Sequence, residues 1–402
     1  MTNTANLPFY LAKFELITYM RVLIVSGGKP TKKYPFIGNF AFEQAVALAD
    51  SGTDVTFFGI DLRSFRRKRP YGISYGVAGK VRWYVISIPI GAVPLSLLCF
   101  IGAKALSYLY SKVYKNRKKP DIVHAHFTEI GQMAASLVKK IDVPLVITEH
   151  SSAMNCENVN ESLQKCALKG YKMAARVVAV SHPLSQNIKR YTGIDAIVIP
   201  NMIKLDVFCK CEHRAHKGYR FVTTGLLIER KRTLNTIKAI EAIHRLGYNV
   251  HLDVIGDGHL RSVLMEYVWK HDLHDIVMFH GILSPMEIVK VYEECDCFVL
   301  PSAGETFGVV YVEAMAAGLP VIATRCGGPE DFVNEDNGIL IDVDDAEQLQ
   351  NAFLSFMNAP KHCSPTRLRD YAKENYGPEQ LALRLNRLYK DCLLYTSPSP
   401  RD

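Results

Sequence analysis

The chain has 402 residues, of which 48% are hydrophobic and 22% charged, which is typical of a soluble globular protein with room for two domains. Its ten cysteines show neither a disulfide framework nor the spacing of structural zinc ligands, so we expect reduced thiols in a cytoplasmic protein. The formal net charge of +8 includes basic clusters at 66–69 and 115–119. No nucleic-acid recognition motif accompanies them, so we expect an anionic lipid, an anionic acceptor or a solvated basic face without a partner, and no nucleic acid.

The two ends of the chain differ from the rest. Met20 begins the first convincing strand, and residues 1–19 are an extension that lacks the basic region and cleavage site of a secretory signal. Residues 394–402 are unlike the preceding helix and are interpreted as a non-native tail. Neither segment enters the functional interpretation.

The first elements form a βαβ unit. A strand over 20–27 leads through a long loop past Gly38 to a helix over 40–49, and a strand over 54–58 follows. The unit is Rossmann-like, although the G-x-G-x-x-G fingerprint of dinucleotide binding is absent.

No residue between Trp83 and Ala103 is charged, a length that suggests a membrane helix. Prolines and a glycine interrupt the stretch at Pro89, Gly91 and Pro94, so we expect no membrane span. Aromatic and basic residues follow, namely Tyr108, Tyr110, Tyr114 and the cations of 112–119. The region either contacts an anionic membrane surface peripherally or is an internal apolar segment of its domain.

Polar residues follow two neighbouring strands. The strand over 119–127 carries His124 and His126, which period-2 alternation places on one face, but no third ligand at usable spacing supports a metal site. The strand over 143–148 delivers Glu149 and His150 to the same edge of the sheet. Because ligands of open α/β sheets lie outside the carboxyl ends of strands, these residues are candidates for a ligand cleft.

Further strands over 177–181 and 196–201 complete a first domain, 20–201, and the charged, aperiodic segment 202–218 is predicted to be a linker. A second domain is predicted over 219–375, followed by a helix over 376–393.

The second domain opens with a strand that ends at Gly225. A loop with Arg230, Lys231 and Arg232 leads from it into a helix that begins near Thr233. Cations at such a position would stabilise the negative charge of a diphosphate.

The stretch 301–320 is the most informative. A strand, Cys297–Leu300, is followed by a loop and by an amphipathic helix that is predicted to begin near Phe307 and to stop at Gly318. The unpaired amides at the helix start favour a phosphate, and they belong to Phe307, Gly308, Val309 and Val310. Glu305 and Glu313 bracket these amides. Because carboxylates repel phosphate, we expect both to accept hydrogen bonds from sugar hydroxyls.

These features resemble a known pattern. The segment from Phe298 to Asp331, with G-L-P-V-I-A at 318–323 and G-G-P-E at 327–330, closely resembles the donor-binding signature of family-4 retaining glycosyltransferases. The resemblance covers nearly all of 20–393. It implies the glycosyltransferase B fold, an α/β fold in which two Rossmann-like domains face each other across a cleft, with the nucleotide-sugar donor on the second domain and the acceptor on the first. The last helix would cross back to the first domain.

The resemblance also implies roles for single residues. His126 would face the donor sugar, Lys231 would contact the diphosphate, and the turn of Gly38 and Asn39 would lie in the cleft. Taken alone, Gly38 is more readily explained as a turn residue, and Glu149 and His150 become candidates on the acceptor side or in the cleft.

The sequence departs from the family pattern twice. Leu226 stands where the family has an arginine, and Arg232 stands where it has a glycine. Arg230 or Arg232 could supply the missing cation, and the sequence leaves both alternatives open.

The sequence therefore predicts a retaining transferase that moves a hexose-type sugar from a nucleoside-diphosphate sugar to a glycan or a lipid-linked oligosaccharide, without a metal or other cofactor. Glu305, Lys231 and His126 are the expected catalytic residues, Glu305 binding the sugar and Glu313 the ribose. Two alternatives remain, a nucleotide-sugar epimerase of the same fold and a non-catalytic partner that binds sugar nucleotides. We expect a cytoplasmic protein, with possible contact to the membrane.

Overall fold

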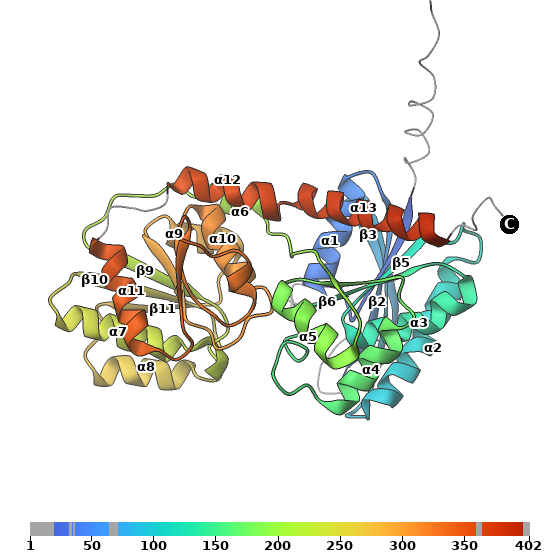
Figure 1. The fold of residues 1–402 in the computed structure, drawn as a ribbon, viewed down its shortest axis with the longest axis horizontal. Helices are drawn as coiled ribbons and strands as arrows, with labels where there is room; N and C mark the ends of the chain where they lie inside the picture. The colour runs from blue at the N-terminus through green and yellow to red at the C-terminus, as the bar shows by residue number, and fades with distance from the viewer. Residues whose placement is uncertain (1–19, 32–33, 35–36, 64–70, 359–363, 397–402) are drawn as a thin grey trace, which may run out of the picture.

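The computed structural model describes residues 20–31, 34, 37–63, 71–358 and 364–396. Within these residues, two lobes are each built around a twisted, mainly parallel sheet, and two helices run end to end along one side of both lobes (Figure 1). The predicted α/β fold with two Rossmann-like units is confirmed. The basic cluster at 66–69 and the extension over 1–19 lie outside the described residues.

The first lobe contains an eight-stranded sheet within the described residues, in the order β3-β4-β2-β1-β5-β6-β7-β8. Its strands are β1 (Arg21–Ser26), β2 (Asp54–Arg63), β3 (Gly72–Ala78), β4 (Val81–Pro89), β5 (Ile122–His126), β6 (Leu145–Glu149), β7 (Arg176–Ala179) and β8 (Ile197–Val198). Its helices are α1 (Asn39–Asp50), α2 (Leu95–Val113), α3 (Thr128–Ile141), α4 (Glu161–Tyr171) and α5 (His182–Thr192). Helices cover both faces, and for that reason the central strands β5 and β6 are buried along their whole length.

The second lobe contains a six-stranded sheet within the described residues, in the order β11-β10-β9-β12-β13-β14. Its strands are β9 (Tyr219–Thr224), β10 (Val250–Ile255), β11 (Val277–Gly281), β12 (Cys297–Leu300), β13 (Val321–Thr324) and β14 (Gly338–Ile341). Its helical segments are η2 (Glu229–Lys231), α7 (Thr233–Arg245), α8 (Arg261–Lys270), α9 (Pro285–Tyr292), α10 (Val309–Ala317), η3 (Gly328–Asp331) and α11 (Ala346–Asn358). The predicted strand before the donor signature matches β12 residue for residue.

The chain crosses between the lobes twice, at neighbouring positions. The predicted linker contains a short helix, α6 (Leu205–Phe208), and the Ile203 amide bonds the Tyr376 carbonyl at 3.0 Å where α12 (Pro365–Tyr376) ends. Helix α13 (Pro378–Thr396) then packs against α1, burying Leu385 and Tyr389 beside the first sheet (Figure 1). It continues three residues past Leu393, into the segment 394–402 that was interpreted from the sequence as a non-native tail.

The uncharged stretch around residues 83–103 divides between strand β4 and helix α2. One side of α2 is part of the core of the first lobe, with Cys99, Leu106 and Leu109 buried. Among the described residues, no helix combines the length and the apolar character that crossing a bilayer requires. Of the three tyrosines in the stretch that follows, Tyr110 and Tyr114 stack on each other against the core, with ring centroids 4.6 Å apart.

Helix α10 corrects one prediction from the sequence. It is not amphipathic, because six of its nine residues are buried, including Tyr311 and Met315. It begins at Val309, two residues later than predicted, after Gly308 in a left-handed conformation. A helix buried nearly all round packs between the second sheet and α12, and such a helix has no polar stripe to show in the sequence.

Candidate functional site

A hollow of about 750 Å³ lies between the lobes at the carboxyl edge of the second sheet. The first lobe contributes Ser152, Asn155, Cys156, Glu157, Asn158, Pro183, Asn187 and Arg190. The second lobe contributes Arg230, Ala303, Gly304, Glu305, Thr306, Cys326, Gly327 and Glu330. This hollow is referred to as the cleft. It contains the loop of the sequence signature, as expected for a ligand site of an open α/β sheet.

Lys231 and Glu305 form an ion pair beside the cleft. Lys231 Nζ lies 2.5 Å from Glu305 Oε1, and their side chains are only 12% and 8% exposed. Gly225, directly after β9, lies beside the Lys231 side chain, whose nearest carbon atom would be in ordinary contact, at 3.7 Å, with a Cβ at that position. The structure thus brings together three of the residues that the sequence assigned to the donor.

The backbone of Glu305 is held by both lobes. Its amide donates to the Cys326 carbonyl at 3.1 Å, and its carbonyl accepts from the Gly328 amide at 2.9 Å. The same carbonyl accepts from Asn155 Nδ2 of the first lobe at 3.0 Å, and Asn187 Nδ2 donates to Asn155 Oδ1 at 3.1 Å. Two asparagines therefore connect the first lobe to the loop that carries Glu305.

The start of α10 presents amide groups next to this loop. Gly308 has φ 94°, and a Cβ there would lie 2.7 Å from the Tyr311 ring, so glycine is required. Val309 and Val310 are half-buried and lie in the first turn, where amides have no acceptor inside the helix. The side chain of Phe307 is 3% exposed and packs on Phe332, so only its backbone is available to a ligand.

Glu313 lies one turn further along α10, half-buried and facing the first lobe. Burial raises its pKa to about 8, the charge of Glu43 on α1 adds to the shift, and Lys204 opposes it. Glu43 and Lys204 form an ion pair of 2.7 Å. The predicted ribose carboxyl therefore lies where α1, the crossing segment and α10 meet.

Arg230 and Arg232 are the two candidates for the cation that the family pattern has at the position of Leu226. The Leu226 side chain itself is 56% exposed. Arg232 is turned away from the cleft and binds Asp344 through two hydrogen bonds, of 2.7 and 2.8 Å. Arg230 lines the cleft, and its guanidinium has no hydrogen-bond or ion-pair partner among the described residues. The geometry favours Arg230 as the additional cation.

Three histidines of the first lobe, His124, His126 and His150, form a largely buried chain with Gln44. Gln44 Nε2 lies 3.2 Å from both His124 Nδ1 and His126 Nε2, and His126 Nδ1 lies 2.9 Å from His150 Nε2. His124 and His126 are fully buried, which lowers the pKa of His124 to about 3 and that of His126 well below its ordinary value. Both nitrogens of His126 are thus engaged inside the protein, and its contact with a donor sugar stays a prediction.

His150 is the outermost member of this chain. It is half-buried, its ring stacks on Phe40 of α1 with centroids 5.8 Å apart, and burial lowers its pKa to about 4. Of the residues predicted at the ends of β5 and β6, namely His126, Glu149 and His150, only His150 is partly exposed.

Glu149 lies inward rather than toward the cleft. It accepts from the His150 and Ser151 amides at 2.8 and 2.7 Å, from Tyr171 Oη at 2.8 Å and from the Thr128 hydroxyl. Burial raises its pKa, and these donors act in the opposite direction. The carboxylate shapes the turn after β6, and no oxygen of it faces solvent.

Gly38 and Asn39 occupy the start of α1. A Cβ at Gly38, which has φ 65°, would lie 2.1 Å from the Gly28 carbonyl oxygen. This close approach supports the interpretation of Gly38 as a turn residue, and Asn39 is the first residue of the helix.

The sequence did not identify Asn155, Asn187, Arg190 or Gln44. The first three are polar residues on the loop before α4 and on α5, in segments without a motif, and they approach the second lobe only in the folded chain. Gln44 lies on the buried side of α1, and a glutamine among apolar residues at helical spacing was its one available signal.

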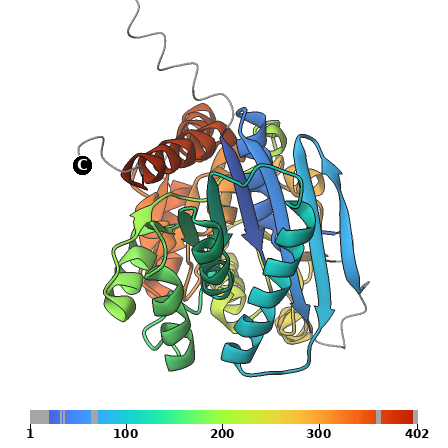
Figure 2. The same ribbon diagram turned by 90° about the vertical axis from the view of Figure 1, so that its right-hand side faces the viewer.

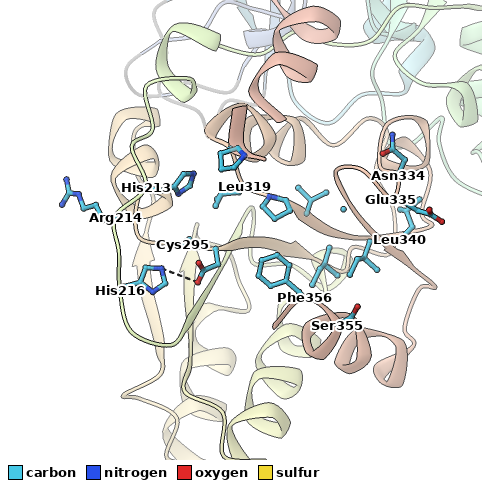
Figure 3. A pocket seen from close by; sticks show the side chains of 18 of the residues that line it. His213, Arg214, His216, Cys295, Leu319, Asn334, Glu335, Leu340, Ser355 and Phe356 are labelled. Atoms are coloured by element: carbon cyan, nitrogen blue, oxygen red, sulfur yellow. Dashed lines mark ion pairs between the residues drawn. The ribbon is translucent and has the colours of Figure 1, made fainter. Parts of the chain in front are cut away.

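A second hollow, of about 670 Å³, lies in the second lobe (Figure 3). Its lining includes Asp296, Pro320 and Gly338, from the amino ends of β12, β13 and β14, with Phe356 and Leu340 on one wall. It therefore lies at the opposite edge of the sheet from Glu305 and Lys231. Within the described residues, no group of three or more His, Cys, Asp or Glu side chains is arranged to hold a metal ion.

Comparison with protein families gives matches in both lobes. Residues 37–207 match the model described as Glycosyltransferase Family 4, and residues 211–375 match the model described as Glycosyl transferases group 1. A putative teichuronic acid biosynthesis glycosyltransferase of Bacillus subtilis is 28% identical over 84% of this chain and 89% of its own length. A glycogen synthase of Mycobacterium tuberculosis is 27% identical over 60% of this chain and 61% of its own length.

Solved structures show the same fold. Sucrose-phosphate synthase from Thermosynechococcus elongatus superposes with a TM-score of 0.75 at 20% identity, covering 94% of this chain and all of that one. The Anabaena protein HepE, solved with UDP, gives a TM-score of 0.68 at 16% identity, covering 92% of this chain and 100% of that one.

The two facing sheets and the cleft between them define a glycosyltransferase of the B fold. The chain belongs to the family-4 retaining glycosyltransferases, also described as glycosyl transferases group 1, enzymes that use nucleotide sugars.

Proposed function

We propose that this transferase moves a hexose from a nucleoside-diphosphate sugar to a glycan or lipid-linked oligosaccharide, without a divalent metal, at the cytoplasmic face of a membrane. The observation that carries the proposal is the Lys231–Glu305 pair at the cleft, next to the amides of α10. A carboxylate for sugar hydroxyls, a cation for phosphate and a helix N-terminus for the remaining phosphate charge then lie together.

In this proposal each residue contacts a different part of the nucleotide-sugar donor. Glu305 accepts hydrogen bonds from the donor sugar, and Lys231 lies between that carboxylate and the diphosphate. The amides of Gly308 to Val310 and the guanidinium of Arg230 bind the phosphate oxygens, and Glu313 accepts from the ribose hydroxyls. The negative charge that grows on the departing diphosphate is thus stabilised by preorganised donors.

Retention of configuration is proposed to follow front-face attack. The acceptor hydroxyl forms its bond to the anomeric carbon on the side from which the diphosphate leaves, and a phosphate oxygen takes the hydroxyl proton. The bond from the anomeric carbon to the phosphate oxygen breaks in the same event, so charge and protons balance. Contacts between the lobes, such as Asn155 to the Glu305 carbonyl, keep water out of the cleft when it closes.

The test is a thermal-shift and donor-hydrolysis screen with UDP-, GDP- and ADP-sugars in the presence of EDTA. One donor class should raise the melting temperature and be hydrolysed slowly, and both effects should be lost in Glu305→Gln. Glu335→Gln, the same change at an exposed carboxyl by the other hollow, is the matched control.

Three outcomes contradict the proposal. If no nucleotide sugar shifts the melting temperature, the donor site is assigned wrongly. Accumulation of an isomerised nucleotide sugar without an acceptor identifies an epimerase. Turnover that EDTA abolishes disproves the metal-independent mechanism.

A further inference from the structure

One part of the first lobe has an unusual charge composition. The 59 residues between Asp61 and Asp121 include 13 Lys and Arg but no Asp or Glu. The whole chain has 48 basic and 40 acidic residues, so acidic residues outnumber basic ones outside this segment. The described part of the segment forms the end of β2, the β3–β4 hairpin, helix α2 and the residues after it, and eight of the 13 basic side chains lie in this part.

One set of alternating side chains of β3 points to the side of the sheet on which helix α2 packs. Tyr75 of β3 is paired with Tyr84 of β4, and their rings stack at 6.2 Å. Tyr84 in turn contacts Phe58, in the core cluster that α2 covers. Alternation along β3 places Ile73 and Val77 on the same side as Tyr75.

The sheet extends beyond the helix, and this part of it is apolar and uncovered. Figure 2 shows the hairpin projecting past α2 at the edge of the lobe. Four residues at alternating positions are exposed there: Tyr71 at 74%, Ile73 at 41%, Tyr75 at 74% and Val77 at 70%. They form a row of aromatic and branched side chains on an edge strand.

The outer side of α2, on the same side of the sheet, is also partly apolar. Leu97, Phe100, Lys104, Tyr108 and Lys112 follow one another at helical spacing, with Phe100 61% and Tyr108 50% exposed. Lys104 Nζ lies over the Phe100 ring and Lys112 Nζ over the Tyr108 ring, each 5.5 Å from the centroid. Neither lysine forms an ion pair with a described residue, whereas Lys80 and Arg82 of the hairpin bind Asp50 and Asp54.

This combination identifies the kind of partner. Unpaired cations alone would suit any polyanion, but a soluble polyanion would make no favourable contact with the exposed apolar side chains of Phe100, Leu97 and Val77. An anionic bilayer surface accommodates both, since lysines meet lipid phosphates while aromatic and aliphatic side chains enter the headgroup region. A protein partner would add acidic groups, but nothing in the structure indicates one.

We infer that the face formed by β3, the outer side of α2 and the cations after α2 binds an anionic membrane surface. The inference rests on the proposed function, because a lipid-linked acceptor would give this membrane contact its purpose. β4 ends at Pro89 on the carboxyl edge of the first sheet, and α2 begins there at Leu95, so the apolar end of the face borders the acceptor side. A lipid-linked acceptor held in the bilayer would thus meet the cleft from this edge.

The test is flotation of the full chain with vesicles of equal parts phosphatidylglycerol and phosphatidylcholine, or of phosphatidylcholine alone. The parent should bind only the anionic vesicles and should be released as salt rises from about 0.05 to about 0.5 M. The double variant Lys104→Glu with Lys112→Glu should lose about tenfold or more of the apparent affinity. Phe100→Ser should weaken binding in a way that low salt does not restore.

Matched changes on the second lobe serve as controls. Lys270→Glu with Lys290→Glu reverses two exposed lysines, and Trp269→Ser removes a 72% exposed aromatic side chain, so both should bind like the parent. Three results would overturn the inference. The control variants lose as much affinity as the test variants, the parent binds both vesicle types equally, or soluble polyphosphate releases the protein while Phe100→Ser has no effect. Donor hydrolysis by every variant reports separately on the proposed function, because a transferase that fails to bind vesicles still turns over donor.

Discussion

Lys231 and Glu305 are 74 residues apart in the chain, yet Lys231 Nζ lies 2.5 Å from Glu305 Oε1 at the carboxyl edge of the second sheet. The two loops also share a backbone hydrogen bond, from the Ala303 amide to the Arg230 carbonyl at 2.7 Å. In the proposed donor site, this relationship explains how a carboxylate can lie beside a phosphate. Lys231 offsets the charge of Glu305, so a diphosphate can approach without facing an unpaired negative group.

Replacing Lys231 by Met should abolish most turnover and also lower stability. The change removes the cation near the developing charge, which should reduce kcat by about 10²–10³, and leaves Glu305 buried without a partner, at a cost of about 3–5 kcal/mol. The double variant Lys231→Met with Glu305→Gln separates the two effects. It should recover the melting temperature but not activity, whereas recovery of both would show that the pair is only structural.

Arg230 and Arg232 should behave differently when each is changed to Ala. Arg230→Ala should weaken donor binding about tenfold without lowering the melting temperature, because its guanidinium lines the cleft and binds no described residue. Arg232→Ala should leave donor binding nearly intact and lower stability, since it loses both hydrogen bonds to Asp344. Calorimetric titration of the nucleoside diphosphate, with thermal melts, measures both. The reverse pattern would return Arg232 to the phosphate site.

Much of the fold followed from the sequence, because strands bounded by Gly and Pro are local signals. Cys297–Leu300 was predicted residue for residue. The loops that carry Lys231 and Glu305 were also placed correctly at strand ends, but their direct contact depends on the order of β9 and β12 in the sheet. Strand order is a long-range property that local patterns do not encode.

The remaining differences arise from burial. Helix α10 was expected to be amphipathic and is almost fully buried, because α12 covers the side that a two-layer unit would leave exposed. Glu149 was placed at the sheet edge correctly, but its carboxylate turns inward to Tyr171 and Thr128, partners that come from helices elsewhere in the lobe. For Tyr110 and Tyr114 the sequence left open a membrane-facing or an internal position, and both pack partly buried against the core.

The buried histidine chain should make the protein acid-sensitive. His124 has a folded pKa of about 3 and His150 of about 4, both below the ordinary 6.5, so the unfolded state takes up protons first. Stability should therefore fall as pH decreases from about 6.5 toward about 4. Gln44→Leu should lower stability at every pH by about 1–3 kcal/mol, because His126 Nε2 loses its donor, whereas His124 Nδ1 keeps the Tyr389 hydroxyl as a partner.

Denaturant melts across this pH range measure the effect. His124→Asn should flatten the acid slope, while His274→Asn, at a half-exposed histidine of the second lobe, should leave it unchanged. Equal slopes in the parent and His124→Asn would place the acid sensitivity elsewhere.

Glu313 should titrate at a mildly alkaline pH. Its folded pKa of about 8 lies above the ordinary 4.5, so its contribution to stability is complete below about pH 4.5 and is lost as pH rises through 8. Glu313→Gln cannot ionise, and its stability relative to the parent should therefore increase from acid toward pH 8 and then level off. Its affinity for the nucleoside diphosphate should be about tenfold lower at high pH, where the parent carboxylate accepts from the ribose.

Glu43→Gln provides an independent check on the electrostatic origin of this shift. Removing the Glu43 charge also frees Lys204 from its 2.7 Å ion pair, and both changes favour the ionised form of Glu313. The midpoint of the pH dependence should then move below that of the parent, measured from melting temperature and from donor affinity. An unchanged midpoint would show that desolvation alone sets the pKa, and that α1 does not act on the donor site through its charge.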